Sequence, residues 1–101
     1  MAERSIICLG SAVWDTIFQV ESIPTAGIKV LPSRALQIAS GMATSAAITI
    51  ARLGGNVQLW SRVRDDDIAR RFIQDVQGEG VDAGFVRMQP GLTTPFSTVI
   101  V

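Results

Sequence analysis

The stretch ASGMATSAAITIARLGG, residues 39–55, decides how this 101-residue chain folds. Its first half consists almost entirely of small side chains, whereas its second half contains good helix formers and ends in Gly54-Gly55, a helix stop signal. The stretch therefore predicts a helix over about residues 42–53. Small residues at the start of a helix leave room for another group, which is either a packed strand or a ligand lying against bare backbone.

Apolar runs on either side of this helix predict the other elements. The run SIICLG (residues 5–10) predicts a strand buried on both faces, in which Cys8 is a core thiol. Alternation in VWDTIFQV (residues 13–20) predicts a strand with Trp14 and Phe18 on one face. Weaker or shorter patterns predict strands over residues 28–39, 56–63, 84–88 and 96–101, and a second helix over residues 65–80.

The order of these elements predicts the fold class. Strands and helices alternate after residue 40, which is typical of an α/β fold with a largely parallel sheet. The segments 13–20 and 28–39 have no helix between them, so we expect them to leave the main sheet and form a small β layer of their own. Because the chain ends inside the apolar strand 96–101, we expect it to be the front part of a longer domain.

Composition and charge argue against several classes of function. Nine basic residues balance nine acidic ones without a basic stripe, so neither nucleic acid nor an anionic membrane surface is an expected partner. No apolar run reaches ~18 residues and the N-terminus lacks the apolar core of a secretory signal, so we expect a cytoplasmic protein without a membrane span. With no histidine and one cysteine, the chain has no Ser-His or Cys-His nucleophile pair and no expected metal site.

The common phosphate-binding motifs do not occur either. Gly10 is followed by Ser11, Ala12 and Val13, whereas a dinucleotide-binding turn needs G-x-G-x-x-G, and no Gly-Lys-Ser/Thr triplet of a P-loop is present. The three aspartates at 65–67 are expected to cap the second helix and to bind no metal. The sequence therefore identifies no catalytic and no cofactor-binding residue in this chain.

Five motifs that remain carry a resemblance to a known family. They are a strand and glycine followed by an aspartate (CLGSAVWDTIFQV), a Pro-Gly turn (IPTAG), a small-residue helix start leading to ARLG, a strand ending in RVRDDD, and an EGVD turn. In this order they resemble the N-terminal third of the ribokinase-like (PfkB-type) carbohydrate kinases, over essentially all 101 residues. The resemblance implies the N-terminal part of a ribokinase-like three-layer α/β sandwich over residues 1–101, with residues 13–20 and 28–39 as a small β-sheet lid and without the C-terminal ATP-binding part.

The chain departs from the family pattern at four places. Ser40 stands where the family commonly has the first of two glycines, and Ser45 stands where it has asparagine. Arg64 and Ala69 replace glycines next to and after the aspartates. A small hydroxyl residue in place of asparagine, together with Lys29, is most similar to the branch that includes sulfofructose kinases. These departures bear on the identity of the sugar and leave the implied fold unchanged.

The resemblance implies five substrate-binding residues. Asp15 would accept hydrogen bonds from sugar hydroxyls, because a carboxylate accepts two donors at once. Ser40 and Gly41 would let backbone N–H groups approach the sugar at the helix N-terminus, and Ser45 would offer a hydroxyl. Lys29, on the β layer, would reach a phosphate, carboxylate or sulfonate. Without the resemblance, Asp15 is a solvated face residue and Lys29 an edge-strand lysine that guards against aggregation.

The implied activity is transfer of the γ-phosphoryl group of ATP to a hydroxyl of a small sugar, with Mg²⁺, and Lys29 and Ser45 favour an anionic ketose. The catalytic aspartate and the Gly-Ala-Gly-Asp helix start of the family lie downstream, so the 101-residue chain alone is expected to be inactive. The β layer of such kinases acts as a lid and often as a dimer interface, which suggests a homodimer in which Trp14 and Phe18 form a hydrophobic patch.

Two other functions stay open at this point. The chain could be a non-catalytic sugar-binding or dimerisation module from a truncated gene. The unpaired apolar strand at 96–101 would then be an aggregation hazard, which argues against that possibility. A nucleotide-binding regulator has no motif in its favour.

Overall fold

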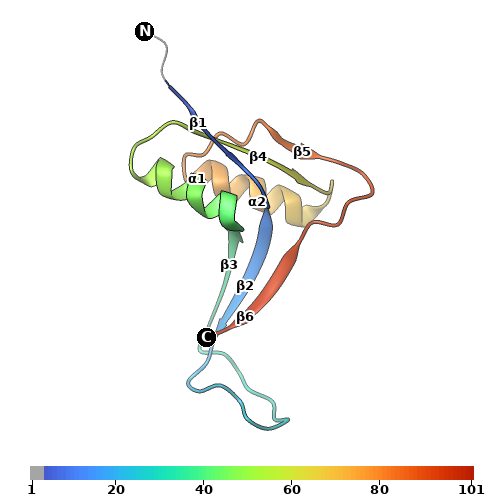
Figure 1. Ribbon diagram of the computed structural model, residues 1–101. Helices are drawn as coiled ribbons and strands as arrows, with labels where there is room; N and C mark the ends of the chain where they lie inside the picture. Colours follow the sequence, from blue (N-terminus) through green and yellow to red (C-terminus); the bar gives the residue numbers. More distant parts are fainter. Residues whose placement is uncertain (1–3) are drawn as a thin grey trace.

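The computed structural model describes residues 4–101, which form two three-stranded sheets and two helices (Figure 1). Its elements are, in chain order, β1 (Ile6–Leu9), β2 (Val13–Gln19), β3 (Arg34–Ser40), α1 (Met42–Arg52), β4 (Val57–Val63), α2 (Asp67–Gly78), β5 (Val86–Met88) and β6 (Phe96–Ile100). The first sheet has the order β1-β4-β5 and the second the order β3-β2-β6. Both helices are the ones that the sequence predicts, each slightly shorter than expected.

The core forms between the first sheet and the two helices. β1, β4 and β5 are parallel, and alternate residues of β4 are buried, including Leu59 and Val63. These side chains belong to the same apolar cluster as Ala47 of α1 and Phe72 and Val76 of α2, and all five are fully buried. Burial of apolar side chains of this size is the main source of stability in such a fold. The predicted α/β class with a parallel sheet is therefore confirmed.

Strand β1 is more exposed than its sequence predicts. Ile6 and Ile7 are about half exposed and Leu9 is 77% exposed, so this strand is not buried on both faces. Among the described residues β1 pairs with β4 alone, and the helices cover one face of the sheet, so the other face of β1 remains open. Cys8, expected to be fully buried, is half-buried and packs against the core cluster.

The second sheet is the small β layer that the sequence predicts, with one strand more than expected. Its central strand β2 is antiparallel to β3 and parallel to β6. The expected strand 28–39 is shorter in the structure, because the pairing of β2 with β3 ends at Gln19 and Arg34 and because Pro32 has no N–H to donate. Residues 20–33 instead form a loop at the end of the sheet that lies away from the helices (Figure 1).

Trp14 lies in the core and not on an exposed patch of the second sheet. Its side chain is 8% exposed, because the first part of β2 contacts α2, whereas Phe18 farther along the strand is half-buried. On the neighbouring strand the Ala39 N–H donates to Asp75 Oδ2 of α2 at 2.7 Å. The expected hydrophobic patch of Trp14 and Phe18 is therefore wrong for Trp14, which helps to fix this end of the sheet to the helical layer.

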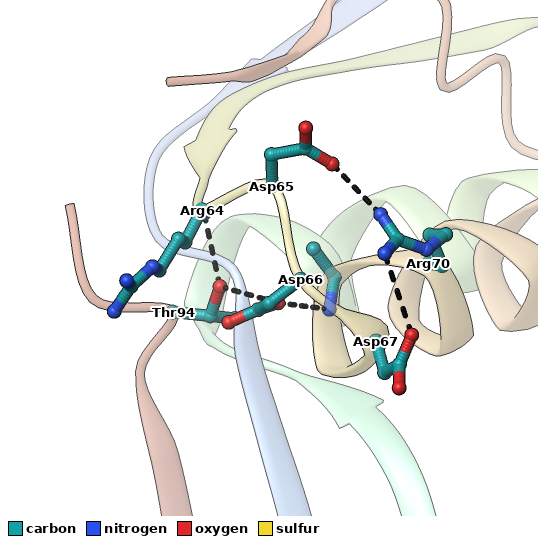
Figure 2. A network of polar contacts seen from close by, with 7 residues as sticks. Arg64, Asp65, Asp66, Asp67, Arg70 and Thr94 are labelled. Carbon is teal, nitrogen blue, oxygen red and sulfur yellow. Dashed lines mark hydrogen bonds and ion pairs between the residues drawn. The ribbon is translucent and has the colours of Figure 1, made fainter. Parts of the chain in front are cut away.

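A buried threonine links the start of α2 to the segment before β6 (Figure 2). Asp66 is the N-cap of α2, and its Oδ1 accepts hydrogen bonds from the Ala69 N–H at 2.8 Å and from Thr94 Oγ1 at 3.2 Å. Thr94 Oγ1 in turn accepts from the Arg64 N–H at 2.9 Å. Because Thr94 is only 2% exposed, water does not reach its hydroxyl, and the hydrogen bonds with Asp66 and Arg64 take the place of those with water. The same hydrogen bonds fix the point at which β6 begins.

The other two aspartates of this turn bind an arginine of the same helix. Arg70 contacts Asp65 at 2.7 Å and Asp67 at 3.4 Å, and all three side chains are at least half exposed (Figure 2). Exposed pairs of this kind contribute little stability. The prediction that these aspartates cap α2 is confirmed for Asp66.

The start of α1 lies against the connection between β1 and β2. Gly41 has φ of +103°, and a Cβ at this position would lie 2.5 Å from the Ser11 carbonyl oxygen. A Cβ on Gly10 would lie 2.8 Å from Ala43 Cβ, and Thr44 Oγ1 donates to Ser11 O at 3.0 Å. The two backbones can approach this closely only because Gly10 and Gly41 have no side chain.

We predict that Gly41→Ala lowers the free energy of unfolding by about 2–4 kcal/mol, because alanine at positive φ and a steric overlap with Ser11 both cost energy. Gly54→Ala is the matched control, because Gly54 has a similar φ of +87° but no atom within 4 Å of the added Cβ. We expect it to lose only about 1–2 kcal/mol. Urea unfolding measures both, and equal losses would show that the contact with Ser11 is unimportant.

We also predict that Thr94→Val lowers the free energy of unfolding by about 1–3 kcal/mol, because valine keeps the shape but removes the part-buried hydrogen bond that the Arg64 N–H makes with this side chain. Thr93→Val changes an exposed residue next to it and should stay within about 0.5 kcal/mol of the wild type. Thermal and urea unfolding compare the two variants. A Thr94 variant as stable as the Thr93 variant would contradict the role given to this hydrogen bond.

Candidate functional site

Asp15 is a half-buried carboxylate on the central strand of the second sheet, near the end of the sheet where Ser40 lies. In the register of β2 it lies between Ile38 of β3 and Ser97 of β6. Ser97 Oγ donates a hydrogen bond to Asp15 Oδ1 at 2.5 Å. Among the described residues no other group donates to this carboxylate, so Oδ2 and the remaining lone pairs of Oδ1 can accept donors from a ligand.

The last residue of β3 and the first turn of α1 lie at the end of this sheet that faces the helices. Ser40 is opposite Val13, and strand alternation puts it on the face of the sheet that carries Asp15. Gly41 follows as the N-cap of α1, with no side-chain cap hydrogen bond and no acidic residue in the first turn. Backbone N–H groups at such a helix start attract oxygen atoms of a ligand, while the space that a Gly41 side chain would take is filled by the Ser11 carbonyl.

Ser45 lies one turn into α1. Its N–H donates to the Gly41 carbonyl at 2.8 Å, and its exposed side chain lines a cleft of about 260 Å³ between β3, α1 and α2. Arg52 and Glu79 also line this cleft, and Arg52 donates two hydrogen bonds of 2.7 and 2.6 Å to the Glu79 carboxylate. The hydrogen bond from Arg52 holds the pKa of Glu79 below its usual value, so this pair is weakened when the pH falls through the range of Glu79 titration.

Lys29 is the sequence-predicted site residue that lies apart from the others. It is exposed, on the loop 20–33, and not on a strand as expected. This loop follows the Gln19–Arg34 pair, at the opposite end of the sheet from Ser40 and Gly41 (Figure 1). The structure therefore places Asp15, Ser40 and Gly41 near one end of the second sheet and Ser45 in the neighbouring cleft beside β3, whereas Lys29 lies at the other end of the sheet.

Ser97 is not among the site residues that the sequence predicts, because its position beside Asp15 depends on which sheet β6 joins. In the sequence, Ser97 stands out only as a serine inside the apolar run FSTVIV. Such a run predicts a strand but does not predict which strands pair with it. The parallel pairing of β6 with β2 brings this hydroxyl next to Asp15, 82 positions away in the chain.

The described residues contain no cluster of side chains that would bind a metal ion. No group of three or more His, Cys, Asp or Glu side chains within residues 4–101 is arranged to hold a metal ion, and Asp65 to Asp67 are used by the cap of α2 and by Arg70. Neither helix of this part of the chain has the length and apolarity needed to cross a bilayer. The polar groups around Asp15 and the start of α1 are hydroxyls, backbone amides and one carboxylate, which suit a polyhydroxylated ligand.

Comparison with known proteins identifies the family and the fold of this chain. The model of the pfkB family of carbohydrate kinases matches residues 3–101. A ribokinase-like protein from Agrobacterium tumefaciens is 40% identical, with a TM-score of 0.93 over 99% of this chain and 33% of that chain. The fructokinase of Vibrio cholerae O395, solved with fructose, ADP and a calcium ion, is 29% identical, with a TM-score of 0.70 over 96% of this chain and 27% of that one.

A more distant structure has the same fold. The ribokinase of Arabidopsis thaliana, solved with ribose and ATP, is 22% identical with a TM-score of 0.75, and the match covers 99% of this chain and 32% of that one. The chain thus spans about a third of the length of these solved relatives. Because the family model covers nearly the whole chain and a relative of 40% identity has the same fold, this chain belongs to the PfkB family of carbohydrate kinases.

Proposed function

We propose that this chain is the sugar-binding part of a kinase that transfers the γ-phosphoryl group of ATP to a hydroxyl of a small sugar. The observation that carries the proposal is the position of Asp15, on the same face of the second sheet as Ser40 and beside the uncapped start of α1 at Gly41. Family membership supports the reaction class, and the arrangement of donors and acceptors supports a sugar as the ligand.

Each group in this arrangement has a separate task. The Asp15 carboxylate would accept hydrogen bonds from two neighbouring sugar hydroxyls and so fix the sugar ring. The first backbone N–H groups of α1, next to Gly41, would donate to oxygen atoms of the sugar. Ser40 and Ser45 can both donate and accept, so they would complete the contacts on the helix side. Holding the sugar in one orientation is what allows a single hydroxyl to react.

ATP and Mg²⁺ belong to the proposal as the phosphoryl donor and its metal ion, and a location in the cytoplasm follows from the need for ATP. None of the site residues named above would hold ATP or Mg²⁺, so we expect this chain alone to bind sugar without transferring phosphate.

We further propose that the second sheet acts as a lid and as the contact of a homodimer. Its exposed apolar side chains support this, namely Leu36, Ile38, Phe96 and Ile100.

The experiment that tests the proposal is a phosphorylation assay on the protein at its natural length. It uses ATP, Mg²⁺ and a panel of pentoses, hexoses and anionic ketoses. Asp15→Asn keeps the shape of the side chain but replaces one acceptor oxygen by a donor, so we expect kcat/KM for the sugar to fall by about 10–100-fold. Gln19→Ala, at the exposed end of the same strand, should change kcat/KM less than about twofold.

Two outcomes of this assay would contradict the proposal. A wild-type protein that phosphorylates none of the sugars would exclude a sugar kinase of the tested range. An Asp15→Asn variant with the kcat/KM of the wild type would show that a sugar is phosphorylated without the help of this carboxylate.

We also propose that the substrate is an anionic ketose, as Lys29 and Ser45 suggest. Lys29 lies beyond the far end of β2 and β3, so its contact with a sugar at Asp15 requires the loop 20–33 to bend over the site. A phosphate, carboxylate or sulfonate on the sugar would then pair with the lysine ammonium group.

Lys29→Ala should therefore raise KM for an anionic sugar by about tenfold, because it removes a charge-assisted contact, and should leave KM for a neutral sugar within about twofold. Steady-state kinetics with a matched pair, such as a sugar and its sulfonated or phosphorylated form, measures both effects. Equal changes for the two sugars would rule out Lys29 as the group that recognises an anion.

A further inference from the structure

We propose that Ser97 is a positioning residue for sugar binding, because its hydroxyl fixes the rotation of the Asp15 carboxylate. This inference rests on the proposed function, in which Asp15 accepts hydrogen bonds from the sugar. It adds a residue that does not touch the sugar itself.

The parallel pairing of β2 and β6 places Ser97 beside Asp15. Asp15 and Ser97 are direct partners in the register of β2 and β6, so their side chains leave the sheet on the same face. Ser97 Oγ donates to Asp15 Oδ1 at 2.5 Å, and both residues are half-buried. The partner of Asp15 on its other side is Ile38, which has no polar side-chain atom. Ser97 is therefore the one hydrogen-bond donor to this carboxylate among residues 4–101.

Ser97 is itself held firmly in place. Immediately before β6, the buried Thr94 hydrogen-bonds the Arg64 N–H and the Asp66 carboxylate, and the Trp14 N–H donates to Pro95 O at 2.9 Å. At the other end of the strand the Val101 N–H donates to Phe18 O at 2.9 Å. With both ends of β6 fixed to the rest of the fold, the Ser97 hydroxyl has a defined position from which to donate.

The hydrogen bond from Ser97 affects sugar binding because the carboxylate group of aspartate otherwise rotates easily. The last torsion of aspartate is broad, so a carboxylate without a fixed partner rotates among many orientations. A hydroxyl supplies one donor, so it binds Oδ1 and leaves Oδ2 for the sugar hydroxyls. A carboxylate that is already oriented loses less freedom when the ligand binds, and this raises affinity without a new contact to the ligand.

The test uses the protein at its natural length and its best sugar from the panel. For Ser97→Ala we expect KM for the sugar to rise about tenfold while kcat stays within about twofold, because the lost orientation affects binding of the sugar. Ser97→Thr keeps the hydroxyl on a β-branched side chain suited to a strand, so it should restore most of the affinity. Thr98→Ala removes a hydroxyl from the exposed opposite face of the same strand and should leave KM unchanged.

Calorimetric titration with the sugar alone, without ATP, separates binding from turnover and should show the same tenfold loss for Ser97→Ala. An unchanged sugar affinity in this variant would overturn the role of Ser97 while leaving the kinase proposal intact. Equal rises in KM for sugar and for ATP, without rescue by threonine, would also overturn it, since they would indicate a general loss of structure. A wild-type protein that phosphorylates no sugar would instead overturn the proposed function, and the role of Ser97 with it.

Discussion

The close approach of Ser11 to Gly41 is the constraint on which the rest of this structure depends. The connection between β1 and β2 passes the start of α1 so closely that neither Gly10 nor Gly41 has room for a Cβ. The hydrogen bond from Thr44 to Ser11 O adds a polar contact at the same point. Because β2 begins directly after this contact, the position of Asp15 relative to the helix start is set by it. The small residues of 39–45 therefore serve packing first, and a ligand can use the same bare backbone.

Helix α2 fixes the second sheet through two of its carboxylates. Asp66, at the N-terminal end of the helix, binds Thr94 just before β6, and Asp75, near its C-terminal end, accepts the Ala39 N–H of β3. The two outer strands of the sheet are thus attached to the same helix, with β2 between them. A buried backbone N–H at a sheet edge would be costly without such an acceptor. The site at this end of the sheet is consequently more rigidly held than the loop 20–33 at the other end.

The sequence predicts the helices and the class of fold because these depend on local signals. The apolar face of α2, the cap at Asp66 and the small residues before α1 all lie within a few positions of the elements they define. The pairing of β6 with β2, and with it Ser97, depends on contacts between residues about 80 positions apart, which a strand pattern does not encode. The prediction that β1 is buried on both faces is wrong for a related reason. An apolar run shows that a strand can be buried, but it does not show whether other elements cover both of its faces. The segment with Lys29 has only a weak strand pattern, and because Pro32 has no N–H to donate, the strand begins after it, at Arg34.

The measurement that tests this account most directly is a crystal structure of the protein with its preferred sugar bound. We expect the ring to lie against the backbone of Gly41, with two of its hydroxyls donating to the Asp15 carboxylate, mainly to Oδ2, while Ser97 still donates to Oδ1. A sugar bound elsewhere, with Asp15 in contact with solvent or with protein groups only, would contradict the assignment of this end of the second sheet as the sugar site.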